Sequence, residues 1–205
     1  LRHQVQRADT VHVNTICARV AARGSYNSFL LAEGGQTARD EIQVGLTEKG
    51  AAAKLHGVYL GSGNQVLDST TLIAHRAPNT KSEENYRGAL NDKSRGVFQG
   101  NILVEKGADG TDGQMSNKTL LLSGDAEINS KPQLEIYADD VQCAHGSTAG
   151  ELDDEAMFYL RSRGIPEAHA KAILVEGFLA EVMEEFDLGE LTDTFRARIS
   201  DWMGA

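Results

Sequence analysis

Two metal-binding side chains stand two positions apart in the segment VQCAHG, where Cys143 precedes His145. If this segment is a β-strand, residues two apart project from the same face, so thiolate and imidazole would point the same way. A thiolate is a soft ligand and an imidazole a borderline one, and they suit iron, zinc, copper or iron–sulfur species rather than magnesium or calcium. Taken alone the pair is a weak signal for metal or cluster chemistry, and the residues by themselves favour packing of a buried cysteine or a hydrogen-bonded core.

Two ligands do not complete a tetrahedral metal site. Within the chain His56, His75 or Cys17 could supply more ligands, although nothing in their spacing indicates it. The other source is a second protein that contributes ligands across an interface. Both alternatives remain open from the residues alone.

The sequence lacks several familiar catalytic and nucleotide-binding motifs. GSGNQV (residues 61–66) has neither a following GK[ST] nor a third glycine, so it is not a phosphate loop or a dinucleotide fingerprint. KGADGTDG (residues 106–113) does not place its acids at the alternate positions of a calcium loop, and we expect a turn-rich loop. No GxSxG or HExxH motif occurs. We therefore expect no catalytic residues.

Composition argues against several further classes of protein. The net charge of −10 argues against nucleic acid as a partner, because such binding depends on Lys and Arg neutralising phosphates. No apolar run reaches the roughly 18 residues of a membrane span. Two distant cysteines favour a reducing compartment, so a cytoplasmic location is expected. The chain opens with Leu1 and without a secretory signal, so we expect a fragment of a longer protein.

The elements that must position Cys143 and His145 are short β-type runs. From about Val11 to Gly146, runs of alternating apolar and polar residues are separated by glycines. Such a body could be a sandwich, a barrel or a β-helix, and no strict short repeat decides among them.

After Gly150 the pattern becomes helical, and we divide the chain into a β core at residues 1–150 and a helical domain at 151–205. A first helix is expected to end before Gly164. A second covers Glu167 to Phe186, and a third runs from about Leu191 to Trp202. The second helix carries an apolar stripe of Leu174, Phe178, Val182 and Phe186. These stripes must pack on the β body, on each other or on another protein, and the residues alone favour a small core within the helical tail itself.

Four motifs resemble the SufB/SufD family of iron–sulfur cluster assembly scaffold proteins, and its SufD members more than its SufB members. They are TDGQMSN (111–117), LLLSGDAEI (120–128), KPQLEIYADDVQCAHGSTAG (131–150) and FYLRSRGI (158–165), in the family's order. The resemblance is strongest over residues 72–165. It implies a right-handed parallel β-helix core followed by a small α-helical C-terminal domain, with the family's N-terminal helical domain missing from this chain.

The resemblance also implies a function. Family members of this kind are non-catalytic: they pair with SufB through the β-helix core and dock the SufC ATPase, to which ATP hydrolysis belongs, through the C-terminal helices. Cys143 and His145 would then lie where a transient iron–sulfur cluster forms with SufB ligands, and no cofactor is expected to bind the isolated chain tightly. The isolated chain is expected to form a homodimer through the same core. The expected SufC-docking residues are Phe158, Leu174, Phe178, Val182 and Phe186.

Two alternatives accompany this interpretation. Parallel β-helices also carry carbohydrate-active enzymes that use carboxylates in a surface groove. The chain could also be a purely structural partner of SufB, in which Cys143 and His145 orient the interface without binding the cluster.

Overall fold

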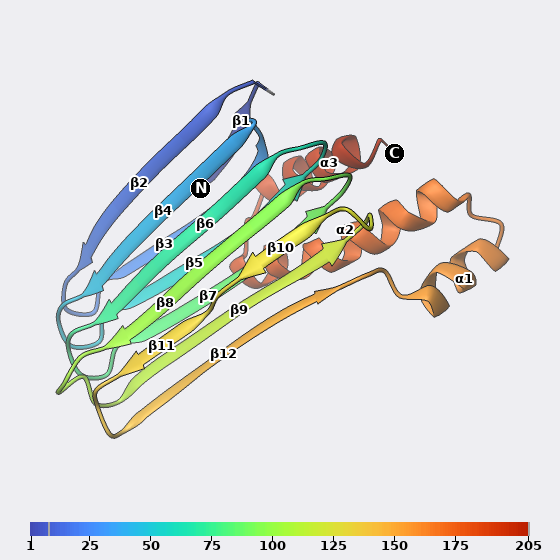
Figure 1. Cartoon of the computed structure of the whole chain (residues 1–205). Coiled ribbons are helices and arrows are strands. Elements are labelled where there is room, and N and C mark those ends of the chain that lie inside the picture. The colour runs from blue at the N-terminus through green and yellow to red at the C-terminus, as the bar shows by residue number, and fades with distance from the viewer. Residues whose placement is uncertain (8, 205) are drawn as a thin grey trace.

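The structure is a computed structural model that describes residues 1–7 and 9–204. Its strands form two parallel sheets that face each other, followed by three helices (Figure 1). Sheet A has the order β1-β3-β5-β7-β9-β12, with strands Arg2–Gln6, Ser25–Gly34, Ala52–Gly61, Lys81–Leu90, Thr111–Leu121 and Val141–Gly150. Sheet B has the order β10-β8-β6-β4-β2, with strands Glu127–Ser130, Arg95–Val104, Val66–His75, Thr37–Leu46 and Val11–Val20, and β11 (Gln133–Ile136) also pairs with β8.

The chain alternates between the two sheets and returns to each after one coil. Thr37 pairs with Val66, and Val66 with Arg95, 29 residues further along the chain each time. The result is a parallel β-solenoid of about five turns, which confirms the β-helix expected from the family resemblance and excludes the sandwich and the barrel. Other coils differ in length, with 26 residues between Val11 and Thr37 and 31 between Lys81 and Asp112, which explains why no strict sequence repeat is visible.

The last coil of sheet B is interrupted. Ser130 pairs with Phe98 and Gln133 with Asn101, so β10 and β11 follow one line along β8 with a break at Pro132. Proline has no N–H to donate to a ladder, and sheets tolerate it at an edge. The break therefore falls on the final, outermost strand line of this sheet.

The two sheets differ in what covers their outer faces. Strands β4, β6 and β8 alternate between buried and more exposed residues, with one side in the core between the sheets. Strands β3, β5 and β7 are buried on both sides over their second halves. The outer face of sheet A is therefore apolar, and a second hydrophobic cluster covers it. Its strand members are Phe29, Leu31, Val58, Leu60 and Ala89.

Tyrosine rings fill the space left by glycines inside the solenoid. Tyr59 pairs with Gly88 across β5 and β7, and a Cβ at Gly88 would lie 1.9 Å from the Tyr59 ring. The Tyr59 hydroxyl hydrogen-bonds Asn117 Oδ1 at 2.9 Å and Thr119 Oγ1 at 2.6 Å. The Tyr59 ring thus lies along the sheet and reaches β9, so glycine is required at position 88 for steric reasons.

The helices cover the apolar face of sheet A. Helix α1 spans Asp154–Ser162, α2 spans Glu167–Phe186 and α3 spans Leu191–Met203, which confirms the expected helices. In Figure 1, α2 and α3 lie behind the strands, while α1 lies beyond the strand ends. The buried residues of α2 and α3 share one cluster with sheet A: Val175, Leu179, Val182, Met183, Phe195 and Ile199. The amphipathic stripes therefore pack on the β body. No helix in residues 1–7 and 9–204 is both long and apolar enough to span a membrane.

A buried arginine fastens α2 to the sheet. Arg87 of β7 is almost fully buried, and its Nη1 donates to the carbonyl oxygen of Phe178 at 2.7 Å. Its Nη2 pairs with Glu181, and its guanidinium lies 4.9 Å from the centre of the Phe178 ring. One side chain thus makes a charge-assisted hydrogen bond, an ion pair and a cation–π contact with the same helix.

Inside the solenoid, Glu84 of β7 is a buried carboxyl. Its side chain accepts a hydrogen bond of 2.6 Å from Thr71 of β6, on the opposite sheet. Burial raises the pKa of Glu84 to about 7, and the Thr71 hydrogen bond offsets this only in part. Because the folded-state pKa lies above the unfolded value of 4.5, ionisation of Glu84 costs stability as the pH rises through this interval.

We predict that Arg87→Met lowers the free energy of unfolding by about 2 kcal/mol, the value of a hydrogen bond from a charged group. Hydrogen exchange in residues 167–186 should accelerate, because α2 loses its polar attachment. The matched control is Arg95→Met, which removes an exposed ion pair with Glu127 and should change stability by less than about 0.5 kcal/mol. Denaturant unfolding and exchange mass spectrometry measure both, and equal effects of the two substitutions would contradict the attachment.

For Glu84→Gln we predict a pH-dependent gain in stability. Near pH 4 the parent carboxyl is protonated in both states and the difference should be small, whereas by about pH 8 the variant should be more stable by about 3 kcal/mol. Unfolding free energies of the two proteins, measured across this range, test the prediction. A difference that stays constant with pH would show that Glu84 does not titrate inside the solenoid.

Candidate functional site

Cys143 and His145 lie on β12, the last strand of sheet A. In Figure 1 this strand forms the edge of the molecule opposite to β2. Among the described residues, β12 pairs only with β9, so its other edge has no strand beside it. Most of β12 is exposed, with Cys143 half-buried and His145 exposed. The sequence prediction that this segment is a strand is confirmed.

The register shows which side of the sheet the pair faces. Cys143 of β12 is in register with Gly113 of β9, which is in register with Ser82 of β7. In the same way, His145 is in register with Met115 and Met115 with Glu84. Ser82, Glu84 and Met115 are buried in the interior of the solenoid. Since residues in register share a face, Cys143 and His145 both belong to the inner face, at its uncovered end.

The thiol of Cys143 has a partly apolar environment. It packs against the core cluster, and a Cβ at Gly113 would lie 3.4 Å from both Cys143 Sγ and Ser82 Oγ. Burial raises the pKa of this thiol, and its backbone hydrogen bond with Gly113 acts in the opposite direction. The protonated thiol is therefore favoured, and a metal ion must displace its proton to bind.

The other candidate ligands lie elsewhere. His75 is buried, and its ring nitrogens hydrogen-bond Thr80 at 2.8 Å and Ser82 at 2.9 Å; burial lowers its pKa to about 4, so the imidazole is neutral. His56 lies under α2 on the outer face of sheet A. Cys17 is exposed on β2 at the far edge of sheet B. The structure thus joins none of these three residues to Cys143 and His145.

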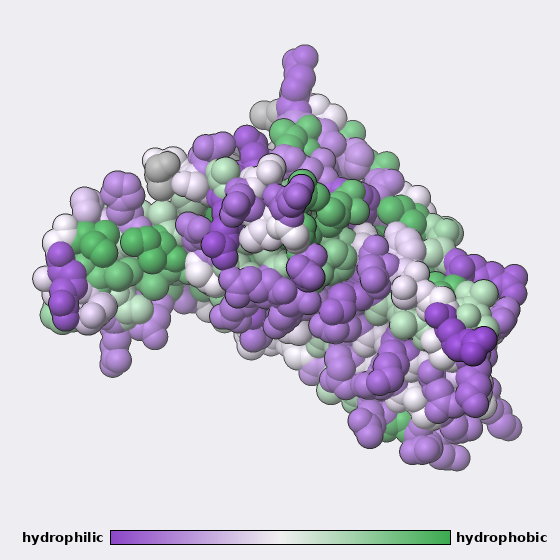
Figure 2. Space-filling view, turned by 180° about the vertical axis from the view of Figure 1, so that it is seen from behind, coloured by the Kyte–Doolittle hydropathy of each residue, from purple (hydrophilic) through white to green (hydrophobic). Residues whose placement is uncertain are grey.

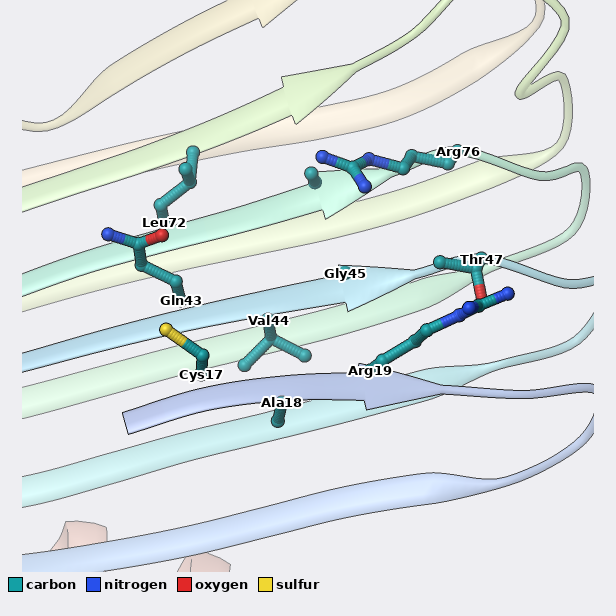
Figure 3. A pocket seen from close by; sticks show the side chains of 10 residues that line it. Cys17, Ala18, Arg19, Gln43, Val44, Gly45, Thr47, Leu72 and Arg76 are labelled. Carbon is teal, nitrogen blue, oxygen red and sulfur yellow. The ribbon is translucent and has the colours of Figure 1, made fainter. Parts of the chain in front are cut away.

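Cys17 lines a pocket on the outer face of sheet B (Figure 3). Its floor crosses β2, β4 and β6, and Gly45 provides no side chain at its centre. Arg19 and Arg76 lie at its margin, and the remaining labelled side chains are aliphatic or neutral polar. The pocket contains no pair of acid and base groups.

A shallow depression of about 350 Å³ lies beside His145. Strands β7, β9 and β12 line it, with Glu83, Asn85, Gln114 and Ser116 among its residues. The alternation along β7 places Glu83 and Asn85 on the outer face of sheet A, opposite to Glu84. The polar surface at this end of the molecule therefore lies next to the strand that carries Cys143 and His145.

The expected SufC-docking residues fall into two groups. Val182 is fully buried against sheet A, Phe178 and Phe186 pack on the same cluster, and Leu174 is half-buried. Phe158 of α1 is 75% exposed, Tyr159 of α1 is 57% exposed, and Ile173 of α2 is 47% exposed. Figure 2 shows a hydrophobic area over the α1–α2 hairpin, at the left of that view. The most exposed large apolar side chains of the helices are thus on this hairpin, and Leu191 of α3 is 38% exposed.

Sequence reasoning did not identify Glu84 or Arg87. Both are charged residues inside the segment KSEENYRGAL, where charges usually indicate solvent. The only available signal was the run of small and apolar residues that follows Arg87, which is typical of a strand buried on both faces.

Comparison with known proteins identifies the family. Residues 1–178 match the family model described as SUF system FeS cluster assembly, SufBD core domain. The chain is 39% identical over 188 residues to the iron–sulfur cluster assembly protein SufD of Escherichia coli, covering 92% of this chain and 44% of that protein. It is 32% identical over 185 residues to SufD of Bacillus subtilis, covering 87% of this chain and 41% of that protein.

A plant relative extends the comparison. Protein ABCI7, chloroplastic, of Arabidopsis thaliana is 28% identical over 197 residues, covering 96% of this chain and 42% of that protein. The chain thus spans less than half the length of each of these three relatives. Because the family model covers most of the chain and the fold is the expected solenoid, this chain belongs to the SufB/SufD family of the SUF iron–sulfur cluster assembly system.

Proposed function

We propose that this chain is a non-catalytic scaffold subunit in iron–sulfur cluster assembly that pairs with SufB and docks the SufC ATPase. The observation that carries the proposal is the position of Cys143 and His145 on β12, at the uncovered end of a β-helix. The similarity to the iron–sulfur cluster assembly proteins SufD of E. coli and B. subtilis supports it.

The end of the solenoid is suited to a second β-helix. The free edge of β12 leaves backbone N–H and C=O groups that a strand of another chain can pair with. Ile136 and Tyr137 are exposed at the same end, and Tyr137 is 63% exposed. Apolar side chains beside an open strand edge favour association with another protein. In the isolated chain, the same end would support the expected homodimer.

In the complex, Cys143 and His145 would supply two ligands and SufB the remainder. The cluster would be transient cargo assembled between the subunits, in keeping with a ligand set split across an interface. The imidazole must be neutral to bind iron and the thiol must lose its proton, so acid should weaken the site. His145 is the better exposed of the two and would be the principal ligand, with Cys143 as an auxiliary thiol.

In this proposal SufC contacts the α1–α2 hairpin, whose exposed side chains include Phe158, Tyr159 and Ile173. Val182 instead packs α2 against sheet A, where it is fully buried. ATP hydrolysis would belong to SufC, and movement of the docked hairpin would be transmitted to sheet A through α2. The contacts of Arg87 with α2 provide a rigid path for this movement.

We predict that His145→Ala removes most of the iron from a complex purified without oxygen after co-expression with SufB and SufC. The complex itself should remain intact, because His145 is exposed on this chain. The matched control is His169→Ala, an exposed histidine of α2. Cluster absorbance and iron per complex are the measurements. Equal iron in both variants would favour the purely structural alternative, and failure of the parent chain to associate would overturn the pairing.

For Phe158→Ser we predict at least a tenfold loss of SufC affinity with SufB pairing unchanged. An exposed aromatic at the centre of an interface typically contributes 2 kcal/mol or more, which is roughly a factor of 30. Tyr137→Ser is the reciprocal control, because Tyr137 lies at the proposed SufB end. Binding of each partner, measured separately, checks both. A SufC affinity unaffected by Phe158→Ser would exclude the hairpin as the docking surface.

A further inference from the structure

Three metal-binding side chains meet on the outer face of sheet A, where the last turn of α2 crosses β5 and β7. They are His56 of β5, Glu83 of β7 and Glu185 of α2. One ligand atom from each lies within 4.8 Å of those of the other two. Within residues 1–7 and 9–204, no other group of three or more His, Cys, Asp or Glu residues has its ligand atoms this close together. This group is separate from Cys143 and His145.

His56 is the unusual member of the group. Its side chain is fully buried, and neither ring nitrogen makes a hydrogen bond of good geometry, although the backbone of Val182 in α2 lies close enough to act on the ring. Its Nε2 faces Glu83 Oε1 at 3.2 Å, and its ring packs on Phe186 with the ring centres 5.5 Å apart. A buried polar atom without a well-formed hydrogen bond is destabilising, and ligation of Nε2 by a metal ion would satisfy that nitrogen.

The protonation state and the distances suit a small transition-metal ion. Burial lowers the pKa of His56, so the imidazole is in the neutral form that binds metals. Ligands about 2.0–2.2 Å from a tetrahedral ion lie roughly 3.4 Å from one another, close to the 3.2 Å between Nε2 of His56 and Oε1 of Glu83. Glu185 is exposed and can adjust its rotamer, and the Asn85 amide donates to its carboxylate.

The surrounding charges and the access route are compatible with a cation. Lys54 Nζ lies 3.3 Å from Oε2 of Glu83, so it occupies the oxygen that does not face His56. Two carboxylates and one ammonium leave a net negative charge beside the neutral imidazole. The Glu83 side chain is 45% exposed and Glu185 is exposed, so the group is open to solvent.

We propose that His56, Glu83 and Glu185 bind a divalent first-row transition-metal ion, with water at the open fourth position. One nitrogen and two carboxylate oxygens form a ligand set that Zn²⁺ accepts readily. Because the ligands come from two strands and a helix, the ion would fasten the C-terminal end of α2 to sheet A. Arg87 fastens the same helix one to two turns earlier, at Glu181 and Phe178.

The probe is Zn²⁺ alone, titrated calorimetrically into the purified, metal-stripped chain. Cys17→Ser and Cys143→Ser are introduced first, so that thiolates do not contribute. The chain should bind one high-affinity Zn²⁺ and gain thermal stability from it. Glu185→Gln should weaken binding at least tenfold, since loss of even an outer-shell partner costs about 10–100-fold. Glu185 is exposed, so the metal-free variant should unfold at the parent temperature.

The matched control is Glu190→Gln, an exposed carboxylate just before α3 and outside the group. It should leave Zn²⁺ affinity and the zinc-induced thermal shift unchanged. Equal affinities of the Glu185→Gln and Glu190→Gln variants would overturn the site, as would the absence of Zn²⁺ binding by the parent. Neither outcome depends on SufB, SufC or cluster formation, so this test is independent of the proposed scaffold function.

Discussion

The outer face of sheet A is apolar, and the rest of the structure depends on covering it. A solenoid has one shared interior, yet β3, β5 and β7 present buried side chains on both sides. Phe29, Leu31, Val58 and Leu60 would face water if the helices were removed. Burial of each such side chain contributes about 1.5–3 kcal/mol, which is enough to hold α2 and α3 against the sheet. The helices and the coils therefore share a core.

Alternation along the strands of sheet A separates two kinds of chemistry. The inner row contains Glu84, Met115 and His145, and it ends at the open end of the solenoid. The outer row contains Glu83, Gln114 and Ala144, and it begins beneath the last turn of α2. Neighbours in sequence such as Glu83 and Glu84 consequently belong to opposite sides of the sheet. The proposed cluster ligands and the proposed metal site use different sides of the same strands.

Attachment of α2 also gives the proposed docking hairpin a mechanical connection. Arg87 contacts the middle of α2, and the group around His56 contacts its end. Helix α1 precedes this attached segment and lies beyond the strands (Figure 1). A force applied at Phe158 would thus reach sheet A through a helix held at two points. The strand that bears Cys143 and His145 belongs to that sheet.

Local sequence patterns were sufficient to predict many of the secondary-structure elements of this protein. The three helices follow from amphipathic spacing and from Gly164 and Pro166, because helix boundaries depend on nearby residues. The strand containing Cys143 and His145 follows from alternation in the same way. The β-helix itself came from family motifs, since the coils differ in length, with 26 residues from β2 to β4 and 31 from β7 to β9, and repeat no residue types.

What only the tertiary structure decided is which distant residues meet. Arg87 and Phe178, or His56 and Glu185, are brought together by the path of the chain over sheet A, and no local pattern encodes that path. The sequence showed that the stripe of Leu174, Phe178, Val182 and Phe186 is apolar. It did not show which surface the stripe packs against. Apolar periodicity determines that a face must be buried, because the hydrophobic effect is non-directional. The surface that buries it depends on how the whole chain packs.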